Sequence, residues 1–321
     1  MSSTHDRSKG ERGENGKLTR RDFLRMAPPA LAGLAIVGGM GAGVTTIARA
    51  ARAAGLRGES GAAPPMHESG SVAEAPRILD YRPLGKTGLK LSDISMGAGV
   101  DDAVIRYAFD RGINYFDTAD SYYNGQGEVA FGKALKSVRD KCVISTKHMV
   151  EAGWKKEVLM EKVNASLKRL DSDYVDLLFM QGVGDPALFK NEEILSAYRA
   201  LKEQGKYRFL CFSTHDTDSV VPAAIESCLF SAAMLMYVPG LFQRMDEMHT
   251  KLYDAGIGII AMKALKGGEG AKVLENAEPG TTFAQASIAW ALRDRKISTV
   301  LISMRTFEHI DEYLKVSGAG R

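Results

Sequence analysis

A carboxylate, a phenol and an amine stand close to the ends of two successive apolar runs of this chain. Asp117 and Tyr122 are five residues apart in the segment 114–122, and Lys147 ends the run 142–147. An isolated tyrosine has a pKa of about 10 and an isolated lysine about 10.4, so neither exchanges protons well at neutral pH. An ammonium beside a phenol favours the phenolate, and a carboxylate keeps the ammonium charged and oriented. The three types together predict a proton-donating site with Tyr122 as a general acid toward a carbonyl oxygen.

The elements that would position these residues alternate in kind along the chain. A hairpin is expected over residues 81–92, around a Gly-Lys-Thr-Gly turn, and short apolar runs then alternate with segments of helical periodicity. The expected strands are 93–96, 114–117, 142–147, 175–180, 207–213, 233–237, 258–262 and 299–302. The expected helices are 102–111, 127–136, 155–170, 192–203, 217–227, 242–255, 283–293 and 307–316.

Eight alternating strand and helix units predict an α/β fold of the (β/α)8 TIM-barrel type. A doubly wound open sheet is the alternative, but it would need a Gly-x-Gly-x-x-Gly turn after its first strand, and Met96-Gly-Ala-Gly99 continues differently. Barrel enzymes carry their sites at the carboxyl ends of the strands, which is where the candidate residues fall.

The first 77 residues differ in kind from the rest. Thr19-Arg-Arg-Asp-Phe-Leu-Arg25 precedes the uncharged run 26–47, which predicts a twin-arginine export signal over residues 1–53. Ala48-Arg-Ala50 and Ala51-Arg-Ala53 both offer cleavage patterns, and without cleavage the run is long enough to anchor the protein in a membrane. Residues 54–77 are rich in Gly and Pro and predict a flexible linker, leaving 78–321 for the barrel.

Composition excludes few classes of protein, but it bears on which binding partners are expected. The chain has 321 residues, of which 45% are hydrophobic and 25% charged, and its formal net charge is +3. That length permits two domains, although α/β barrels of this size are single. Basic residues do not interleave with aromatic ones, so no nucleic-acid surface is expected. The three cysteines are expected to be buried thiols and not disulfides.

The segment Asp117-Thr-Ala-Asp-Ser-Tyr122 and the later Ser145-Thr-Lys147 resemble the active-site motifs of the aldo-keto reductases. The resemblance covers about residues 78–318 and includes collinear landmarks at 205–214, 255–263 and 302–309. It implies a nicotinamide-dependent oxidoreductase in which Tyr122 donates the proton, Lys147 activates it and Asp117 supports Lys147. Gln181 stands where the family usually has His, and its amide can donate a hydrogen bond but cannot titrate.

The resemblance also implies a cofactor site, and the residues expected in it are Ser213, Thr214, Tyr237, Lys263, Ser303, Arg305 and His309. Ser213 would contact the nicotinamide carboxamide, with Thr214 in place of the usual Asn, and Tyr237 would lie beside the cofactor. Lys263 would face the pyrophosphate. Arg305, before an expected helix N-terminus, favours NADP(H) over NAD(H) through a 2′-phosphate. No metal site is expected, because the six histidines lack paired ligand spacing.

The predicted function is an exported, periplasmic NADP(H)-dependent oxidoreductase that interconverts an aldehyde or ketone with an alcohol. Twin-arginine export carries folded proteins, which fits a cofactor inserted before export. Its partners would be the export machinery and a small carbonyl substrate. Its cofactor would either be reduced and reoxidised in place or be recycled by a redox partner. The alternative is an exported nucleotide-binding or partner-binding barrel with little turnover, suggested by the departures at Gln181, Thr214 and Met234.

Overall fold

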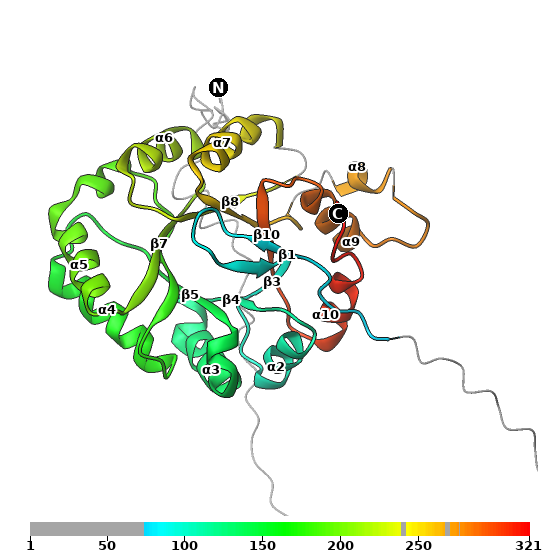
Figure 1. Ribbon diagram of the computed structural model, residues 1–321, viewed down its shortest axis with the longest axis horizontal. Helices are drawn as coiled ribbons and strands as arrows, with labels where there is room; N and C mark the ends of the chain where they lie inside the picture. The colour runs from blue at the N-terminus through cyan, green and yellow to red at the C-terminus, as the bar shows by residue number, and fades with distance from the viewer. Residues whose placement is uncertain (1–73, 239–241, 267–269, 276) are drawn as a thin grey trace, which may run out of the picture. The chain divides into compact units, whose positions relative to one another are not determined.

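The barrel predicted from the alternating pattern is present in the computed structural model, which describes residues 74–238, 242–266, 270–275 and 277–321 (Figure 1). Eight parallel strands close in the order β10-β3-β4-β5-β6-β7-β8-β9. Their bounds are β3 Ile94–Gly97, β4 Tyr115–Asp117, β5 Val143–His148, β6 Val175–Met180, β7 Tyr207–Thr214, β8 Ala232–Met236, β9 Gly258–Met262 and β10 Ile297–Ser303. The predicted (β/α)8 fold class is therefore confirmed.

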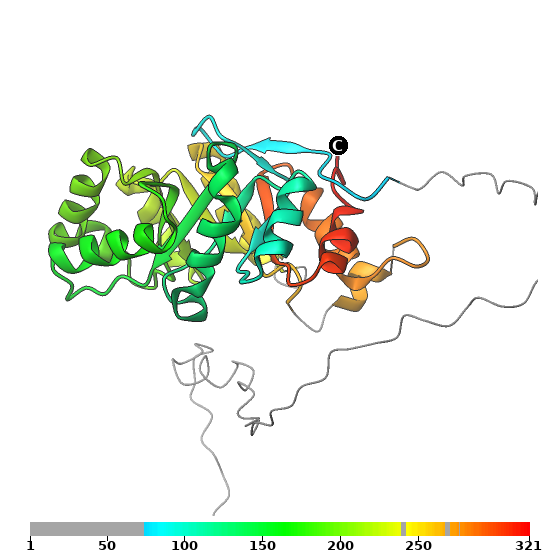
Figure 2. The ribbon, with the colours of Figure 1, turned by 90° about the horizontal axis from the view of Figure 1, so that it is seen from below.

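Helices surround the barrel, and most begin with a side-chain cap (Figures 1 and 2). Asp101, Asn191 and Thr306 each accept a hydrogen bond from the first helical turn that follows them, which satisfies a backbone donor that would otherwise lack a partner. The α-helices are α2 Asp102–Asp110, α3 Gln126–Leu135, α4 Lys156–Arg169, α5 Glu192–Glu203, α6 Thr217–Ser227, α7 Phe242–Ala255, α8 Gly270–Leu274, α9 Phe283–Leu292 and α10 Phe307–Leu314.

Short elements that apolar periodicity does not predict lie in the connections. They are the 3-10 segments η1 Tyr122–Gly125, η2 Lys136–Lys141 and η3 Pro186–Lys190, together with helix α8. Segments of four to six residues are too short to show a repeating face, so the sequence pattern carries no signal for them.

The strands separate two apolar layers, because successive side chains of a strand point to opposite faces. Tyr115, Leu177, Phe179, Cys211 and Ile260 belong to a cluster inside the barrel. The alternate positions of the same strands pack against the helices in the larger outer cluster. This alternation determines which polar residue at a strand end reaches the barrel interior.

A hairpin closes the end of the barrel at which the strands begin. Strands β1 Tyr81–Pro83 and β2 Lys90–Ser92 pair antiparallel, as predicted, and Leu84 and Leu91 are fully buried in the inner cluster. Gly85 has φ +50, and a Cβ there would lie 2.4 Å from the Gly258 nitrogen, so the close approach requires glycine. Figure 2 shows the hairpin across one end of the barrel, which leaves the opposite end for a site.

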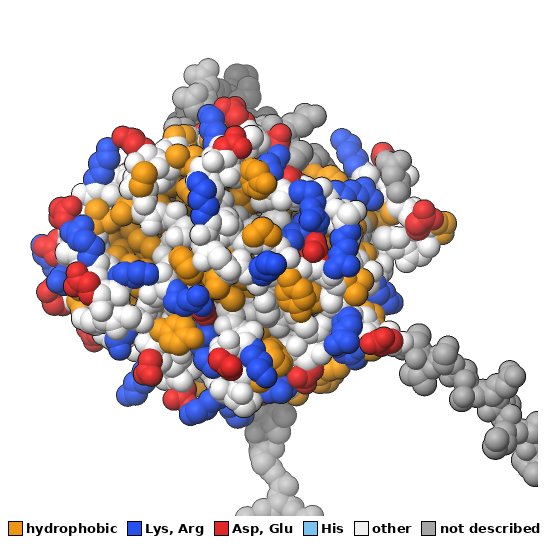
Figure 3. Space-filling model, viewed as in Figure 1, with side chains coloured by type: hydrophobic (Ala, Val, Ile, Leu, Met, Phe, Trp, Pro, Cys, Tyr) orange, Lys and Arg blue, Asp and Glu red, His pale blue; other side chains and the backbone are white. Residues whose placement is uncertain are grey.

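The face that carries the hairpin has no single dominant charge. Figure 3 shows both Lys and Arg and Asp and Glu side chains on this face, among hydrophobic and uncharged ones. Among the described residues, no helix has the length and apolar character needed to cross a membrane. The predicted export signal, residues 1–53, and most of the linker, 54–77, lie outside the described residues.

The three cysteines are free thiols, as predicted, but they are not all buried. Cys142 and Cys211 are buried in strand-like runs, whereas Cys228 is exposed, so the expectation of burial is wrong for Cys228. Cys228 caps the carboxyl end of α6 in a left-handed conformation (φ 53), which places it at the surface.

Two buried histidines make the fold sensitive to acid. Burial lowers the pKa of His148 and of His249 to about 4, against about 6.5 in an unfolded chain. The unfolded state therefore binds more protons between these values, and stability is lost as the pH falls from about 6.5 toward 4. Both ring nitrogens of His249 lack a hydrogen-bond partner in the described part of the chain.

We expect His249→Leu to reduce this loss without abolishing it, because His148 remains. Urea unfolding at pH 8 and at pH 5 measures the difference in the free energy of unfolding. An unchanged difference in the variant would show that His249 is not one of the groups responsible.

Candidate active site

Asp117 and Lys147 form an ion pair inside the barrel, at the carboxyl ends of β4 and β5. Lys147 Nζ lies 2.5 Å from Asp117 Oδ2 and donates a second hydrogen bond to the Thr118 carbonyl at 2.7 Å. The two side chains are only 2% and 3% exposed. A buried ammonium is tolerated when it is paired and hydrogen-bonded in this way. The pair therefore places a fixed positive charge at the strand ends.

The second oxygen of Asp117 is held by two residues that were not predicted. Ser145 Oγ donates to Asp117 Oδ1 at 2.5 Å, and the Tyr115 hydroxyl lies 3.5 Å from the same oxygen and 3.0 Å from Ser145 Oγ. Burial, and then the Asp117 charge, raise the pKa of Tyr115 well above 10, so Tyr115 stays a neutral phenol. The sequence could have predicted these two contacts. Tyr115 and Ser145 precede Asp117 and Lys147 by two residues, and residues two apart in a strand lie on the same face.

Tyr122 lies against this pair. It begins the turn η1 after β4, and Lys147 Nζ lies 4.8 Å from the centroid of its ring. Tyr122 is partly exposed, whereas the adjacent Tyr123 is 45% exposed and has a left-handed φ of 51°. The structure thus brings Asp117, Tyr122 and Lys147 together.

Gln181 follows β6 at the same end of the barrel. Its backbone N–H donates to the His148 carbonyl at 2.8 Å, which ties it to the end of β5. Its side-chain Oε1 is buried and has no hydrogen-bond partner among the described residues. His148 does not replace the missing imidazole, because its Nε2 lies 3.0 Å from Ser166 Oγ on the helix side of the strand. The position usually held by an imidazole is therefore left to the side-chain amide of Gln181.

Ser213 and Thr214 end β7, and their hydroxyls are used within the fold. Ser213 Oγ accepts from the Gly182 N–H at 2.9 Å, and Thr214 Oγ1 donates to the Val183 carbonyl at 2.6 Å. Both residues are at least 95% buried. Ser213 retains a proton that it can donate to a carboxamide, whereas the Thr214 hydroxyl proton is committed to the loop after β6.

Tyr237, predicted to lie beside a cofactor, lies outside the barrel interior. It packs on the helix side, with its ring centroid 5.2 Å from His249 and 5.0 Å from Trp290, and its hydroxyl donates to Asp294 at 2.8 Å. The inward position of β8 is held by Met234, three residues earlier. An odd separation along a strand reverses the face, which explains the placement.

Lys263 lies directly after β9 and contacts His215, the residue that follows β7. Lys263 Nζ is 2.7 Å from His215 Nε2, and Lys263 adopts a left-handed φ of 63°. Desolvation and the nearby Lys266 charge lower the pKa of Lys263. A left-handed, partly desolvated lysine is strained, and an anion at this position would favour its charged form.

Ser303, Arg305 and His309 lie between the end of β10 and the first turn of α10. Ser303 and Arg305 are exposed. The His309 ring accepts from the Arg305 N–H at 3.3 Å and stacks on Tyr313 with an interplanar angle of 9°. Over the described ranges, the Arg305 guanidinium has no hydrogen bond or ion pair. This segment therefore presents a cation beside a helix N-terminus.

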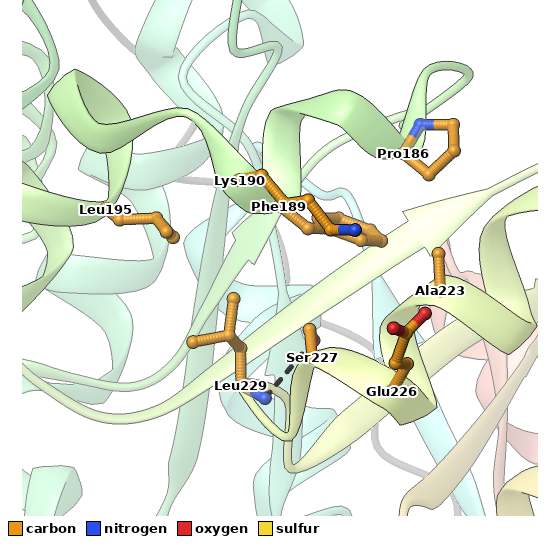
Figure 4. A pocket seen from close by; sticks show the side chains of 8 residues that line it. All are labelled: Pro186, Phe189, Lys190, Leu195, Ala223, Glu226, Ser227 and Leu229. Carbon is orange, nitrogen blue, oxygen red and sulfur yellow. Dashed lines mark hydrogen bonds between the residues drawn. The ribbon is translucent and has the colours of Figure 1, made fainter.

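Other features of the structure are separate from this group. A surface pocket between η3, α5 and α6 is lined by Pro186, Phe189, Lys190, Leu195, Ala223, Glu226, Ser227 and Leu229 (Figure 4). None of these residues belongs to the group around Lys147. Among the described residues, no group of His, Cys, Asp or Glu side chains has an arrangement that could hold a metal ion.

The sequence pattern of the Aldo/keto reductase family matches residues 100–279, more than half of the chain. The chain therefore belongs to the aldo/keto reductase family, which supports an oxidoreductase of carbonyls and alcohols and which typically uses NAD(P)H. The matched region includes Asp117, Tyr122, Lys147 and Gln181, whereas Arg305 lies beyond it.

Individual relatives agree with this assignment. The L-galactose dehydrogenase of Arabidopsis thaliana is 26% identical over 280 residues, which cover 73% of this chain and 86% of the relative. The L-glyceraldehyde 3-phosphate reductase of Escherichia coli (strain K12) is 25% identical over 300 residues, with the same coverage of 73% and 86%. The holo form of aldo-keto reductase AKR11C1 from Bacillus halodurans is 24% identical with a TM-score of 0.63, and the match covers 74% of this chain and 91% of that structure. At this identity the structural likeness supports the fold alone.

Proposed function

We propose that this protein is an NADP(H)-dependent oxidoreductase that interconverts an aldehyde or ketone with an alcohol, using Tyr122 as the proton donor. The observation that carries the proposal is the contact of the Tyr122 ring with Lys147 Nζ at 4.8 Å, while Lys147 is itself paired with Asp117 at 2.5 Å. A phenol beside a fixed ammonium is a suitable acid for a carbonyl oxygen that becomes an alkoxide.

The side chains divide the work on the proton. Asp117, held by Ser145, fixes Lys147 in place, and the ammonium stabilises negative charge on the Tyr122 oxygen as its proton leaves. Gln181 can donate a hydrogen bond from its amide to the substrate oxygen, but it carries no proton that it can transfer. A bound nicotinamide supplies hydride for reduction or accepts it for oxidation.

The residues at the carboxyl ends of the barrel strands have side chains suited to the phosphate groups of a nicotinamide dinucleotide. Ser213 has a hydroxyl proton available for a carboxamide oxygen, Lys263 and His215 meet at the end of β9, and Arg305 is an exposed cation at a helix N-terminus. Cations and helix N-termini both favour phosphate groups. We assign Ser303 and His309 to the same adenosine end of the cofactor site. Thr214 and Tyr237 are further from such a role, because their hydroxyls are bound within the fold.

We expect Arg305→Ala to weaken NADPH binding by about 10- to 100-fold, because a charge-assisted hydrogen bond contributes about 1.5–3 kcal/mol. NADH lacks the 2′-phosphate, so its affinity should change little. Fluorescence titration with both cofactors measures the two dissociation constants. Arg295→Ala is a matched control, because Arg295 precedes the same strand at the opposite end of the barrel. Equal losses for NADPH and NADH would assign Arg305 to another part of the cofactor.

The activity itself is tested by following NADPH absorbance with a panel of carbonyl compounds. The panel includes L-glyceraldehyde 3-phosphate, and L-galactose with NADP+ tests the oxidation direction, because two relatives are named for these compounds. Turnover of at least one member is expected. Cofactor binding without turnover of any would favour the alternative function, a nucleotide-binding barrel, which the replacement of the usual His by Gln181 suggests.

We further propose that the protein is exported in folded form through the twin-arginine pathway. The support is the sequence Thr19-Arg-Arg-Asp-Phe-Leu-Arg25 followed by an uncharged apolar run. Export to the periplasm would require the cofactor to travel with the folded barrel and to be recycled there, which implies a redox partner or a second substrate.

A further inference from the structure

We infer that the Glu128–Arg169 ion pair, on the helix side of the barrel, positions Tyr122 against Lys147; the inference rests on the proposed role of Tyr122. Glu128 belongs to α3 and Arg169 ends α4, so neither is part of the group inside the barrel. Arg169 Nε donates to Glu128 Oε2 at 2.6 Å, and Glu128 is completely buried.

The turn that carries Tyr122 is strained and needs support from its surroundings. Tyr123, Asn124 and Gly125 have φ values of 51°, 52° and 82°, which are three consecutive left-handed residues. The left-handed conformation costs about 1–2 kcal/mol for a residue other than glycine. Such backbone persists where neighbouring groups hold it, and it is common at active sites.

Arg169 is in direct contact with this turn. A Cβ on Gly125 would lie 2.8 Å from Arg169 Cδ and 2.9 Å from its Nε, so the arginine stem packs against the Gly125 backbone. Arg169 Nη2 also donates to Ser166 Oγ at 3.1 Å within α4. With Glu128 on one side and Ser166 on the other, the guanidinium is fixed at the end of the turn that begins with Tyr122.

The other oxygen of Glu128 reaches the strand that carries Lys147. Thr146 Oγ1 donates to Glu128 Oε1 at 2.5 Å, and Thr146 immediately precedes Lys147 in β5. Adjacent strand residues point to opposite faces, so Thr146 meets Glu128 outside while Lys147 meets Asp117 inside. One buried carboxylate thus connects the support of the Tyr122 turn to the strand of its activating lysine.

The test compares Arg169→Ala and Arg169→Lys with a matched buried ion pair, altered by Asp176→Asn. Asp176 is 1% exposed, pairs with Arg139 at 2.9 Å, and accepts from the Ile144 N–H of the same strand β5 at 3.0 Å. Among the described residues, no hydrogen bond or ion pair joins Asp176 to the Tyr122 turn. Arg169→Lys retains the charge that Glu128 needs if the alanine variant fails to fold.

Two measurements are made on the full chain. The first measurement gives kcat, and the KM for a carbonyl compound of the panel, with NADPH as the reductant. The second is the NMR spectrum of the protein labelled with 13C at tyrosine Cζ, in which the Tyr122 resonance is assigned because it is missing in Tyr122→Phe. We expect Arg169→Ala and Arg169→Lys to shift or broaden the Tyr122 resonance. We also expect a loss of about tenfold or more in kcat with little change in KM, because small misplacements of a reacting group are costly. Asp176→Asn should lower stability while leaving the resonance and kcat near those of the original protein.

An unchanged Tyr122 resonance in both Arg169 variants would overturn the inference, as would an equal change in Asp176→Asn. The resonance reports position without requiring turnover. If the original protein reduces no carbonyl compound, the proposed function fails, while the NMR comparison still decides whether the ion pair positions Tyr122.

Discussion

Replacing Tyr122 with phenylalanine is expected to lower kcat for carbonyl reduction by about 100-fold or more, because general acid catalysis typically contributes 10²–10⁴-fold. The variant removes one hydroxyl and leaves the ring that packs on Lys147. NADPH affinity and the free energy of unfolding should therefore stay close to those of the original protein. The loss should appear in kcat, since the hydroxyl acts on charge that develops in the transition state.

Tyr123→Phe is the matched control for this prediction. Tyr123 is the next residue in the same turn but is 45% exposed, and its ring has no contact with Lys147 among the described residues. Its kcat should change by less than about twofold if it plays no part in the chemistry. A large loss in Tyr123→Phe with normal turnover in Tyr122→Phe would reverse the assignment of the proton donor.

The strands and their carboxyl-end residues could be predicted because two signals coincide. Short apolar runs alternate with helical periodicity, and this pattern alone indicates parallel strands with a site at one end. Asp117 and Lys147 each end or nearly end such a run, so their meeting follows from the closure of β4 beside β5. Tyr115 and Ser145 were within reach of the same reasoning, because they share the inward face two residues earlier.

Other features depend on contacts that periodicity does not carry. The motif predicts Tyr237 near a cofactor but carries no information on its hydroxyl partner, Asp294, on the outer face of the barrel. The pairing of Glu128 with Arg169 joins residues 41 positions apart on different helices. The left-handed backbone at Tyr123 has no sequence signal of its own, whereas Asn124 and Gly125 are residue types that adopt this conformation readily.

The site differs from the family pattern at Gln181, where an amide replaces the usual imidazole. An imidazole at this position could titrate, whereas the amide keeps one charge state at every pH. His148, which ends the neighbouring strand β5, has a pKa lowered to about 4 by burial, so it is neutral at neutral pH, and it faces Ser166. Lys147 is therefore the cation that contacts the proton donor, and the stability of its ion pair becomes the main requirement of the site.

Lys147→Met is expected to destabilise the protein by about 3–5 kcal/mol, because removal of one partner leaves the other charge buried and unpaired. The side chain of Asp117 is 3% exposed, so water cannot replace the lost ammonium. The double variant Asp117→Asn with Lys147→Met should recover part of this loss, since an uncharged amide can still bond to Ser145 and Tyr115. Catalysis should stay low in both variants, because neither contains the ammonium beside Tyr122.

Urea unfolding and the NADPH assay, made on the same preparations, separate the two effects. Lys133→Met is the surface control: Lys133 pairs with Asp102 but its side chain is 75% exposed, so its loss should cost less than about 1 kcal/mol. If the double variant regained both stability and turnover, the ammonium would be a structural group and not an activator of Tyr122. If it were no more stable than Lys147→Met, the cost would come from lost packing around the lysine stem and not from the unpaired carboxylate. The expected pattern, partial recovery of stability without recovery of kcat, assigns Lys147 to both the fold and the chemistry of the barrel.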